Sequence, residues 1–224
     1  AVGIEQLDLA NGAAMWMCLV VLLSFHEYGH AWAAYKCGDD TARLMGRMTI
    51  NPIVHIDPIG TVLFPWIMIL LPMMGMELPI AIFGWAKPVP VNPINYEHRV
   101  RGDIFVSMAG PAMNVLLAVL LMVLYRAAVE MPIDLSNGAV VHKLQEIAFI
   151  SMILCVFNLI PIPPLDGSHV MRHVIRMSEE TYLRIAQFGF IILIIAINVF
   201  PELFMIVGWA SLLTIQFLQA ILMF

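Results

Sequence analysis

The chain has 224 residues, of which 61% are hydrophobic and only 12% are charged, and its mean hydropathy is +0.89. These values exclude an ordinary soluble domain and indicate a protein that crosses a membrane several times. The net charge of −5 is spread thinly along the sequence, and nothing in it signals a nucleic-acid partner.

Six apolar stretches follow one another along the chain, and most approach the ~20 residues that a membrane-spanning helix needs. The stretches cover residues 13–35, 61–83, 104–128, 145–162, 185–200 and 203–224. No soluble module fits between them, so we predict a single integral-membrane domain over residues 1–224. Its fold class is an all-α multi-pass membrane protein, a helical bundle. The short segment before Ala13 lacks the basic region of a signal peptide.

The first stretch contains the motif HEYGH at residues 26–30. On a helix, His26 and His30 stack one turn apart on one face and can share a tetrahedral metal, with Glu27 beside them as a general base. Polar groups at membrane depth cost ~2.5–3.5 kcal/mol each, so three of them together indicate a function. We expect one zinc ion per chain; the alternative is a helix whose polar residues merely pair within the bundle.

The region after this stretch has two weaker signals. Residues 43–50 alternate loosely between polar and apolar around Gly46, which predicts a short membrane-associated β element; the alternative is an ordinary loop. His55, in the sequence VHIDP, is either a further site residue, such as a fourth zinc partner in a resting form, or a residue that fixes the loop.

A catalytic zinc has three protein ligands and one open position, so the chain must supply another ligand. Asp166 is our choice. It follows an expected helix over residues 145–160, in the sequence NLIPIPPLDG, where three prolines end the helix and present the carboxylate. Gly167 allows close approach of the backbone. Asp57 is the next carboxylate in line.

Other candidate metal-binding residues carry a weaker pattern. His169 and His173 are also four residues apart, but no Glu lies between them and Arg172 is adjacent, so we interpret them as the start of a cytoplasmic helix. The cysteines have no metal-binding spacing, and we interpret them as packing residues. They are Cys18, Cys37 and Cys155.

The motifs HEYGH and NLIPIPPLDG, each on its own helix, resemble those of the site-2 protease family of intramembrane zinc metalloproteases. Gly110 and Asn114 are similar to the family's Gly-x-x-x-Asn element, and FGWAKPVPVN at residues 83–92 resembles a segment of its compact bacterial branch. The matches run in order from His26 to Gly167. The later residues match only as hydrophobic helices.

The chain departs from the family in small ways. Ser168 stands where many members have a second Gly. No room remains for the PDZ or CBS domains that regulate some relatives, so the regulatory partner is unknown.

The resemblance implies roles for further residues. Asn158 would bind the substrate backbone near the zinc, and Asn114 is a second candidate; for both, the alternative is a hydrogen bond between helices. Residues 43–50 would belong to a sheet that dips into the membrane, whose free edge could hold an extended substrate by strand addition.

The depth of the metal site constrains the topology. HEYGH and Asp166 both lie toward the C-terminal ends of their helices. Residues 13–35 and 145–160 must therefore run in the same direction to bring the two groups to one depth in the membrane. This holds if residues 61–83 form a re-entrant segment that enters and leaves on one side. Pro72 and Pro79 suit such a broken helix.

The basic residues support the same topology. With a re-entrant segment, nine of the 11 Lys and Arg residues lie on one side of the membrane and only Arg126 and Lys143 on the other. Because basic residues gather on the cytoplasmic side, we expect the N-terminus outside and both the C-terminus and the zinc site toward the cytoplasm.

These features predict a cell-membrane zinc endopeptidase that hydrolyses a peptide bond in or near a transmembrane helix of another membrane protein within the lipid bilayer. The alternative is a zinc-binding transporter or a metal-gated membrane protein, with His26, His30 and Asp166 as its transport site. Against transport, no inverted repeat is visible and Glu27 has no obvious task.

Overall fold

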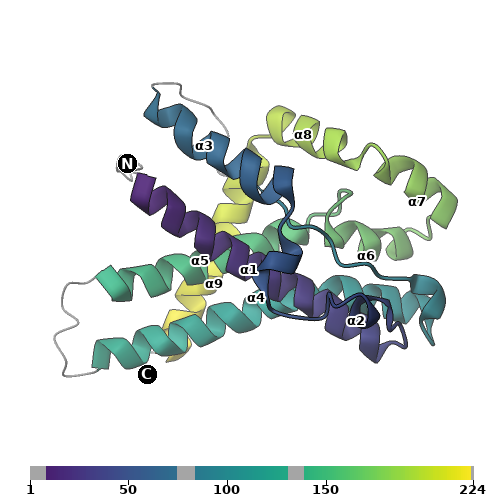
Figure 1. Ribbon diagram of the computed structural model, residues 1–224, viewed down its shortest axis with the longest axis horizontal. Coiled ribbons are helices and arrows are strands. Elements are labelled where there is room, and N and C mark those ends of the chain that lie inside the picture. The colour runs from purple at the N-terminus through teal and green to yellow at the C-terminus, as the bar shows by residue number, and fades with distance from the viewer. Residues whose placement is uncertain (1–8, 75–83, 131–138, 223–224) are drawn as a thin grey trace.

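The computed structural model describes residues 9–74, 84–130 and 139–222, and every regular element in these ranges is helical (Figure 1). The long helices are α1 (Leu9–Lys36), α4 (Arg99–Glu130), α5 (Ala139–Asn158) and α9 (Glu202–Leu222). The shorter elements are α2 (Thr41–Leu44), η1 (Pro52–His55), η2 (Pro58–Leu63), α3 (Phe64–Met73), η3 (Pro93–Asn95), α6 (Asp166–Val174), α7 (Glu179–Ala186) and α8 (Gly189–Val199). The predicted all-α class is confirmed for the described ranges.

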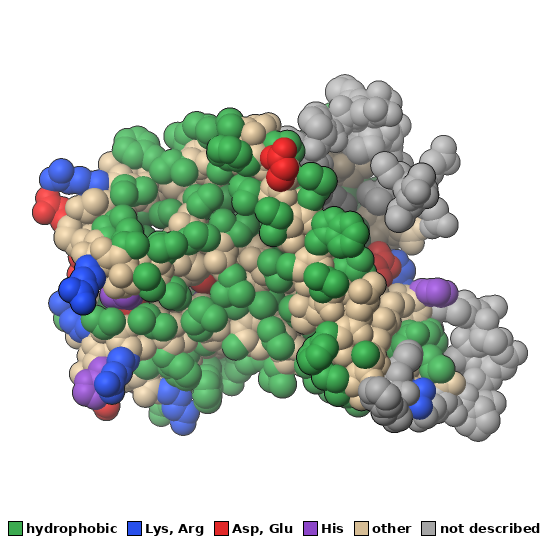
Figure 2. Space-filling view, turned by 180° about the vertical axis from the view of Figure 1, so that it is seen from behind, with side chains coloured by type: hydrophobic (Ala, Val, Ile, Leu, Met, Phe, Trp, Pro, Cys, Tyr) green, Lys and Arg blue, Asp and Glu red, His purple; other side chains and the backbone are tan. Residues whose placement is uncertain are grey.

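Among the described residues, four helices are long and apolar enough to cross a membrane, and the bent pair α7 and α8 would make a fifth span if it counts as one. The four are Leu9–Lys36, Arg99–Val129, Val141–Asn158 and Glu202–Leu222. Even the shortest of them, with 18 residues, is ~27 Å long at 1.5 Å per residue, close to the ~30 Å hydrocarbon core of a bilayer. Figure 2 shows an apolar belt across the molecule, with most of the visible charged side chains at its two ends. The chain is therefore a multi-pass membrane protein.

Helix α4 packs against both α1 and α5 and runs antiparallel to both (Figure 1). His30 of α1 contacts Val106 of α4, while His26, one turn earlier, contacts Asn114, two turns later. Helices α1 and α5 therefore run in the same direction. This is the relation that the pairing of HEYGH with Asp166 requires.

Small residues let α1 and α4 approach closely. A Cβ added to Gly29 would lie 2.6 Å from the carbonyl oxygen of Ala109, so a larger residue would force the helices apart. Ala33 and Ala34 are fully buried in the same contact and pack against Val106. Between membrane helices, where burial from water does not drive association, such close backbone packing is a main source of stability.

Residues 84–92 form an extended segment that lies beside η2. The backbone N–H of Trp85 donates to Gly60 O at 3.2 Å, and the hydroxyl of Thr61 donates to Trp85 O at 2.8 Å. Gly60 must lack a side chain here, because a Cβ would lie 2.2 Å from the Trp85 ring. The chain therefore returns, at residue 85, to the position it had at residues 60–61.

Two buried side chains also hold this extended segment through hydrogen bonds. The Arg47 guanidinium donates to Lys87 O at 2.8 Å. The Asp39 carboxylate accepts hydrogen bonds from the backbone N–H of Asn92 at 2.7 Å and from the side-chain amide of Asn95 at 2.8 Å. The segment is thus fixed near its middle and at its end.

The strand predicted over residues 43–50 is wrong. Thr41–Leu44 is helix α2, and the described residues after it form turns up to η1. The Asp39 carboxylate accepts from both the backbone N–H and the hydroxyl of Thr41, which starts the helical turn. Gly46 has a φ of 67°, which breaks an extended path. Local side-chain hydrogen bonds thus outweigh the weak alternation in the sequence.

The apolar stretch 185–200 is not one straight span. Its helix α8 has 11 residues, ~16 Å, and is bent by 65° from α7. Helix α9 begins beside the end of α5, where the rings of Phe157 and Phe204 stack with centroids 6.3 Å apart. Its far end lies at the same end of the bundle as the start of α1 (Figure 1). Helices α7 and α8 together form either a broken span or a re-entrant loop, so the side of the membrane on which α9 ends stays a prediction.

Asp39→Ala should lower the free energy of unfolding by about 1–3 kcal/mol, because several backbone and side-chain donors lose their buried acceptor. Burial disfavours the charged carboxylate, but hydrogen bonds from Thr41, Asn92 and Asn95 outweigh it and lower the pKa of Asp39. Its stabilisation is therefore complete above the ordinary pKa of ~3.9 and is lost as the pH falls through the lowered value. Thermal unfolding in detergent at neutral and acidic pH measures both effects.

The neighbouring carboxylate provides the control. Asp40 pairs at the surface with Arg43, and such exposed pairs contribute less than about 1 kcal/mol. Equal losses in Asp39→Ala and Asp40→Ala would contradict the role given to Asp39.

Candidate metal centre

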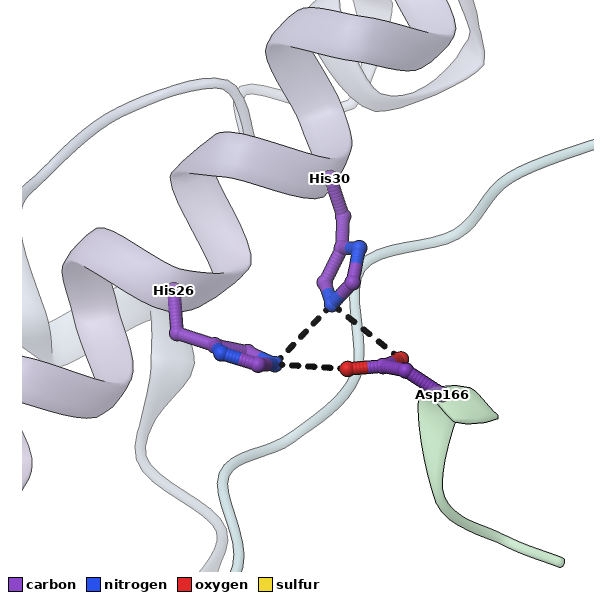
Figure 3. Close-up of side chains that lie close together, drawn as sticks. All are labelled: His26, His30 and Asp166. Atoms are coloured by element: carbon purple, nitrogen blue, oxygen red, sulfur yellow. Dashed lines mark hydrogen bonds and ion pairs between the residues drawn. The ribbon is translucent and has the colours of Figure 1, made fainter. Parts of the chain in front are cut away.

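Helix α1 places His26 and His30 on one face, as their four-residue spacing predicts. Both are buried, with 4% and 9% of their surface exposed. Their Nε2 atoms are 3.0 Å apart and point to the same side of the helix (Figure 3). The two Nε2 atoms therefore lie close together inside the helical bundle.

Asp166 reaches this point from the first turn of α6. Its Oδ2 lies 3.2 Å from His26 Nε2, and its Oδ1 lies 3.4 Å from His30 Nε2 (Figure 3). Gly167 makes this approach possible, because a Cβ there would lie 2.2 Å from the carbonyl oxygen of Leu159. The loop after α5 must close tightly on itself to present the carboxylate.

Ser168, the departure from the family pattern, is accommodated without disturbing Asp166. Its hydroxyl donates to Leu165 O at 2.6 Å and lies 3.0 Å from the hydroxyl of Tyr182. The Ser168 hydroxyl thus makes hydrogen bonds within the fold and does not displace the neighbouring Asp166.

The three side chains fit a zinc ion. Ligands at ~2.0–2.2 Å from a tetrahedral zinc lie about 3.3–3.6 Å from one another, close to the separations given above. Among the described residues, His26, His30 and Asp166 alone form a group of three whose ligand atoms lie within 4.8 Å of one another. The buried Asp166 Oδ2 has no hydrogen-bond partner, as expected of an atom reserved for a metal. Two imidazoles and one carboxylate leave a fourth position open.

Glu27 is held beside this group by the extended segment. Only 8% of its surface is exposed, and its Oε2 accepts a hydrogen bond from the backbone N–H of Val89 at 2.8 Å. This contact crosses from α1 to residues 84–92. The segment fixed by Arg47 and Asp39 therefore sets the position of the Glu27 carboxylate.

A cavity of about 930 Å³ adjoins the group. Glu27 and the three candidate ligands line it. Apolar side chains from α1, α5, α8 and α9 form much of its wall, among them Leu19, Leu23, Leu154, Phe190 and Phe204. The cavity is large enough for several side chains of an extended peptide.

Helix α4 contacts both imidazoles through their Nδ1 atoms. His30 Nδ1 donates to Val106 O at 2.7 Å, which leaves its Nε2 to face the group. The amide of Asn114 lies 3.2 Å from His26 Nδ1 and does not line the cavity. Gly110 sits between them, where a Cβ would lie 2.3 Å from His30 Nε2. The Gly-x-x-x-Asn element thus lies directly against the two histidines that are candidate ligands.

The other two residues named from the sequence lie apart from the ligands. Asn158 lines the cavity, and its amide donates to Leu154 O of its own helix at 2.9 Å. His55 is 2% exposed and its Nε2 donates to Thr49 O at 2.8 Å, so it contacts its own loop rather than the ligand group.

A buried charged cluster in the same cavity was missed by sequence reasoning. The carboxylate of Asp103, 4% exposed, lies 3.0 Å from the Arg172 guanidinium and 2.6 Å from His173 Nε2. His169 Nδ1 lies 3.4 Å from the same carboxylate. These contacts tie α4 to α6, the helix that begins with Asp166. An acidic residue at the start of an apolar helix was the signal, since such a charge needs a partner.

Comparison with known proteins identifies the family. Residues 14–133 and 126–197 match peptidase family M50. The chain belongs to this family. The resemblance to site-2 proteases is therefore confirmed, and it extends beyond the motifs as far as residue 197.

Several curated relatives are similar over most of the chain. "Putative zinc metalloprotease YwhC" of Bacillus subtilis is 35% identical over 183 residues, 79% of this chain and 76% of the relative. "Putative zinc metalloprotease Rip2" of Mycolicibacterium smegmatis is 31% identical over 195 residues, 87% of this chain and 67% of the relative. Rip2 of Mycobacterium tuberculosis is 30% identical over 177 residues, 79% and 63%. No solved structure matches the chain.

Gly110→Ala should reduce zinc occupancy to below about a tenth of the wild-type value, because metal sites tolerate ligand shifts of only ~0.2 Å. The new methyl group would lie 2.3 Å from His30 Nε2 and 2.6 Å from His26 Nε2. Metal analysis of the purified protein measures the occupancy. Gly208→Ala is the control, because a Cβ there meets nothing within 4 Å. Full zinc occupancy in Gly110→Ala would contradict the close approach described here.

Proposed function

We propose that His26, His30 and Asp166 hold the zinc of an intramembrane endopeptidase and that Glu27 is its general base, in one membrane domain. The chain is a zinc metalloprotease because it belongs to peptidase family M50 and its relatives carry that name. The assignment of these four residues is the proposal. The single observation that carries it is the meeting of three ligand atoms from α1 and α6, two of them on buried histidines.

When bound, zinc polarises the scissile carbonyl and makes its coordinated water acidic enough to attack near neutral pH. Glu27 is placed to receive the proton of that water. Among the described residues, its carboxylate accepts one hydrogen bond, from Val89 N–H to Oε2, which leaves Oε1 to take the proton and pass it to the leaving amine. The transport alternative gives Glu27 no such task, and membership of a peptidase family argues against it.

The cavity supports a membrane-protein substrate. Its apolar wall, formed by α1, α5, α8 and α9, suits the side chains of a transmembrane segment. A helical substrate must unwind before its carbonyls can be attacked, so we expect substrates with Gly, Pro or Asn near the cut to be favoured. Asn158 lines this cavity and is placed to bind the exposed substrate backbone.

We also propose that residues 61–83 are re-entrant from the cytoplasmic side and that the metal centre lies toward the cytoplasm, with the start of α1 outside. The hydrogen bonds between Trp85 and residues 60–61 support this, because they bring both ends of the segment together. The parallel course of α1 and α5 supports it too. The uneven distribution of Lys and Arg gives the orientation.

Glu27→Gln should keep stoichiometric zinc but lower peptidase activity by about 10²–10⁴-fold, because the ligands survive while the base is lost. Asp166→Asn should instead lower zinc affinity and activity together, because it removes a ligand. Both substitutions keep the size of the side chain. Metal analysis and cleavage of a synthetic transmembrane peptide with a central Gly-Pro, reconstituted in liposomes, separate the two roles.

Two results would contradict these assignments. Undiminished cleavage by Glu27→Gln would rule out Glu27 as the base. Normal zinc content and cleavage in Asp166→Asn would require another carboxylate as the third ligand.

The topology predicts that positions 45 and 87 lie on the same side of the membrane, opposite position 143. Met45 and the Lys143 side chain are exposed, as is Lys87, so single cysteines there should be tolerated. In a variant that lacks the native cysteines, an impermeant thiol reagent applied to sealed vesicles should label 45 and 87 alike. The reverse accessibility is expected at 143. Opposite accessibility at 45 and 87 would mean that residues 61–83 span the membrane.

A further inference from the structure

Asn114 occupies an unusual position for a membrane-buried amide. It has no exposed surface, and its side chain lies 3.2 Å from His26 Nδ1, on the opposite side of the ring from the metal group. Its amide nitrogen faces the ring, and its Oδ1 is buried with no hydrogen-bond partner. A buried acceptor without a donor destabilises the fold, so this arrangement needs a reason.

The chemistry of the ring supplies the reason. His26 Nε2 faces Asp166 and His30 Nε2, so it must be free of a proton to bind a metal. A neutral imidazole then carries its proton on Nδ1, which becomes a donor. The amide nitrogen of Asn114 is also a donor, so the two cannot pair. Turning the amide by 180° exchanges its oxygen and nitrogen with almost no change in shape, and the oxygen then accepts from Nδ1–H.

We propose that Asn114 is a positioning residue, whose amide oxygen holds His26 in the tautomer that presents Nε2 to zinc. The inference rests on the proposed function, since it assumes His26 as a ligand. It assigns Asn114 to the metal centre rather than to substrate binding. Outer partners of this kind typically contribute a factor of 10–100 to metal affinity.

The second imidazole shows the same arrangement. His30 Nδ1 donates to Val106 O at 2.7 Å, so its tautomer is also set by an acceptor on α4. Val106 and Asn114 are two turns apart on one face, with Gly110 midway between them. A backbone carbonyl points toward the C-terminal end of its helix and a side chain leans toward the N-terminal end, so both acceptors converge on the level of Gly110. One face of α4 thus orients both histidines.

The backbone of Asn114 makes a separate contact that involves neither its side chain nor His26. The hydroxyl of Ser151 on α5 donates to the backbone carbonyl of Asn114 at 2.8 Å. This bond stabilises the contact between α4 and α5 but does not touch His26. Ser151 is therefore a matched control, a buried polar residue in the same contact with no link to the imidazole.

Three variants test the proposal through zinc affinity, measured by competition with a chelator. Asn114→Leu has nearly the same size but no acceptor, and we expect a loss of about 10–100-fold. Asn114→Asp keeps an acceptor and lacks a donor, and we expect an affinity within about threefold of the wild type. Ser151→Ala should leave the affinity unchanged. Thermal unfolding without zinc identifies any variant that loses affinity because its fold is weakened.

The outcomes are distinct. Equal losses in Asn114→Leu and Asn114→Asp, or an unchanged affinity in Asn114→Leu, would overturn the role of the amide oxygen. An equal loss in Ser151→Ala would show that helix packing alone is responsible and would overturn it too. If Asn114→Leu does not fold, ¹⁵N NMR of the zinc-loaded wild type decides, because a His26 without a proton on Nδ1 refutes the proposal. A wild-type chain that binds no zinc would refute the proposed metal centre itself.

Discussion

The close approach of α4 to α1 is the constraint on which the metal centre depends. At Gly29 the helices touch backbone to backbone, and at Gly110 the missing side chain leaves the volume that the two imidazole rings occupy. The same face of α4 supplies Val106 O to one ring and Asn114 to the other. If this contact were looser by the width of a methyl group, neither ring would keep its orientation.

A second constraint acts on the Glu27 carboxylate from outside the helices. Residues 84–92 carry the Val89 N–H that holds Glu27, and the segment is anchored by Arg47 near its middle and by Asp39 at its end. Two prolines in the segment remove backbone donors that would otherwise need partners. Arg47 and Asp39 thus help to set the position of the Glu27 carboxylate, the proposed base, although neither contacts it directly.

Much of the ligand group could be predicted from the sequence because its signal is local. The spacing of HEYGH places the two proposed histidine ligands on one face of a helix, and the prolines before Asp166 predict a tight loop with the carboxylate at its end. The alternation of residues 43–50 predicted a strand wrongly. The hydrogen bonds of Asp39 start a helical turn there instead, and the positive φ of Gly46 breaks an extended path. Likewise, the course of residues 185–200 depends on a 65° bend that hydropathy does not record.

The charged cluster around Asp103 shows the other limit of sequence reasoning. Its partners Arg172 and His173 lie about seventy positions away, and the spacing of His169 and His173 is equally typical of a metal pair. Only the packing of α4 against α6 shows that a carboxylate occupies the space between them. The role of Asn114 could not be predicted from the sequence either, because it depends on which nitrogen of the His26 ring its side chain contacts.

The ligands come from distant parts of the chain, since 136 positions separate His30 from Asp166. During synthesis, α1 enters the membrane long before the loop that carries Asp166 has been made. Until that loop closes and α6 docks against α4, the chain has two imidazoles but no carboxylate. Under the proposed ligand assignment, a half-inserted chain therefore lacks a complete zinc site and the activity that depends on it.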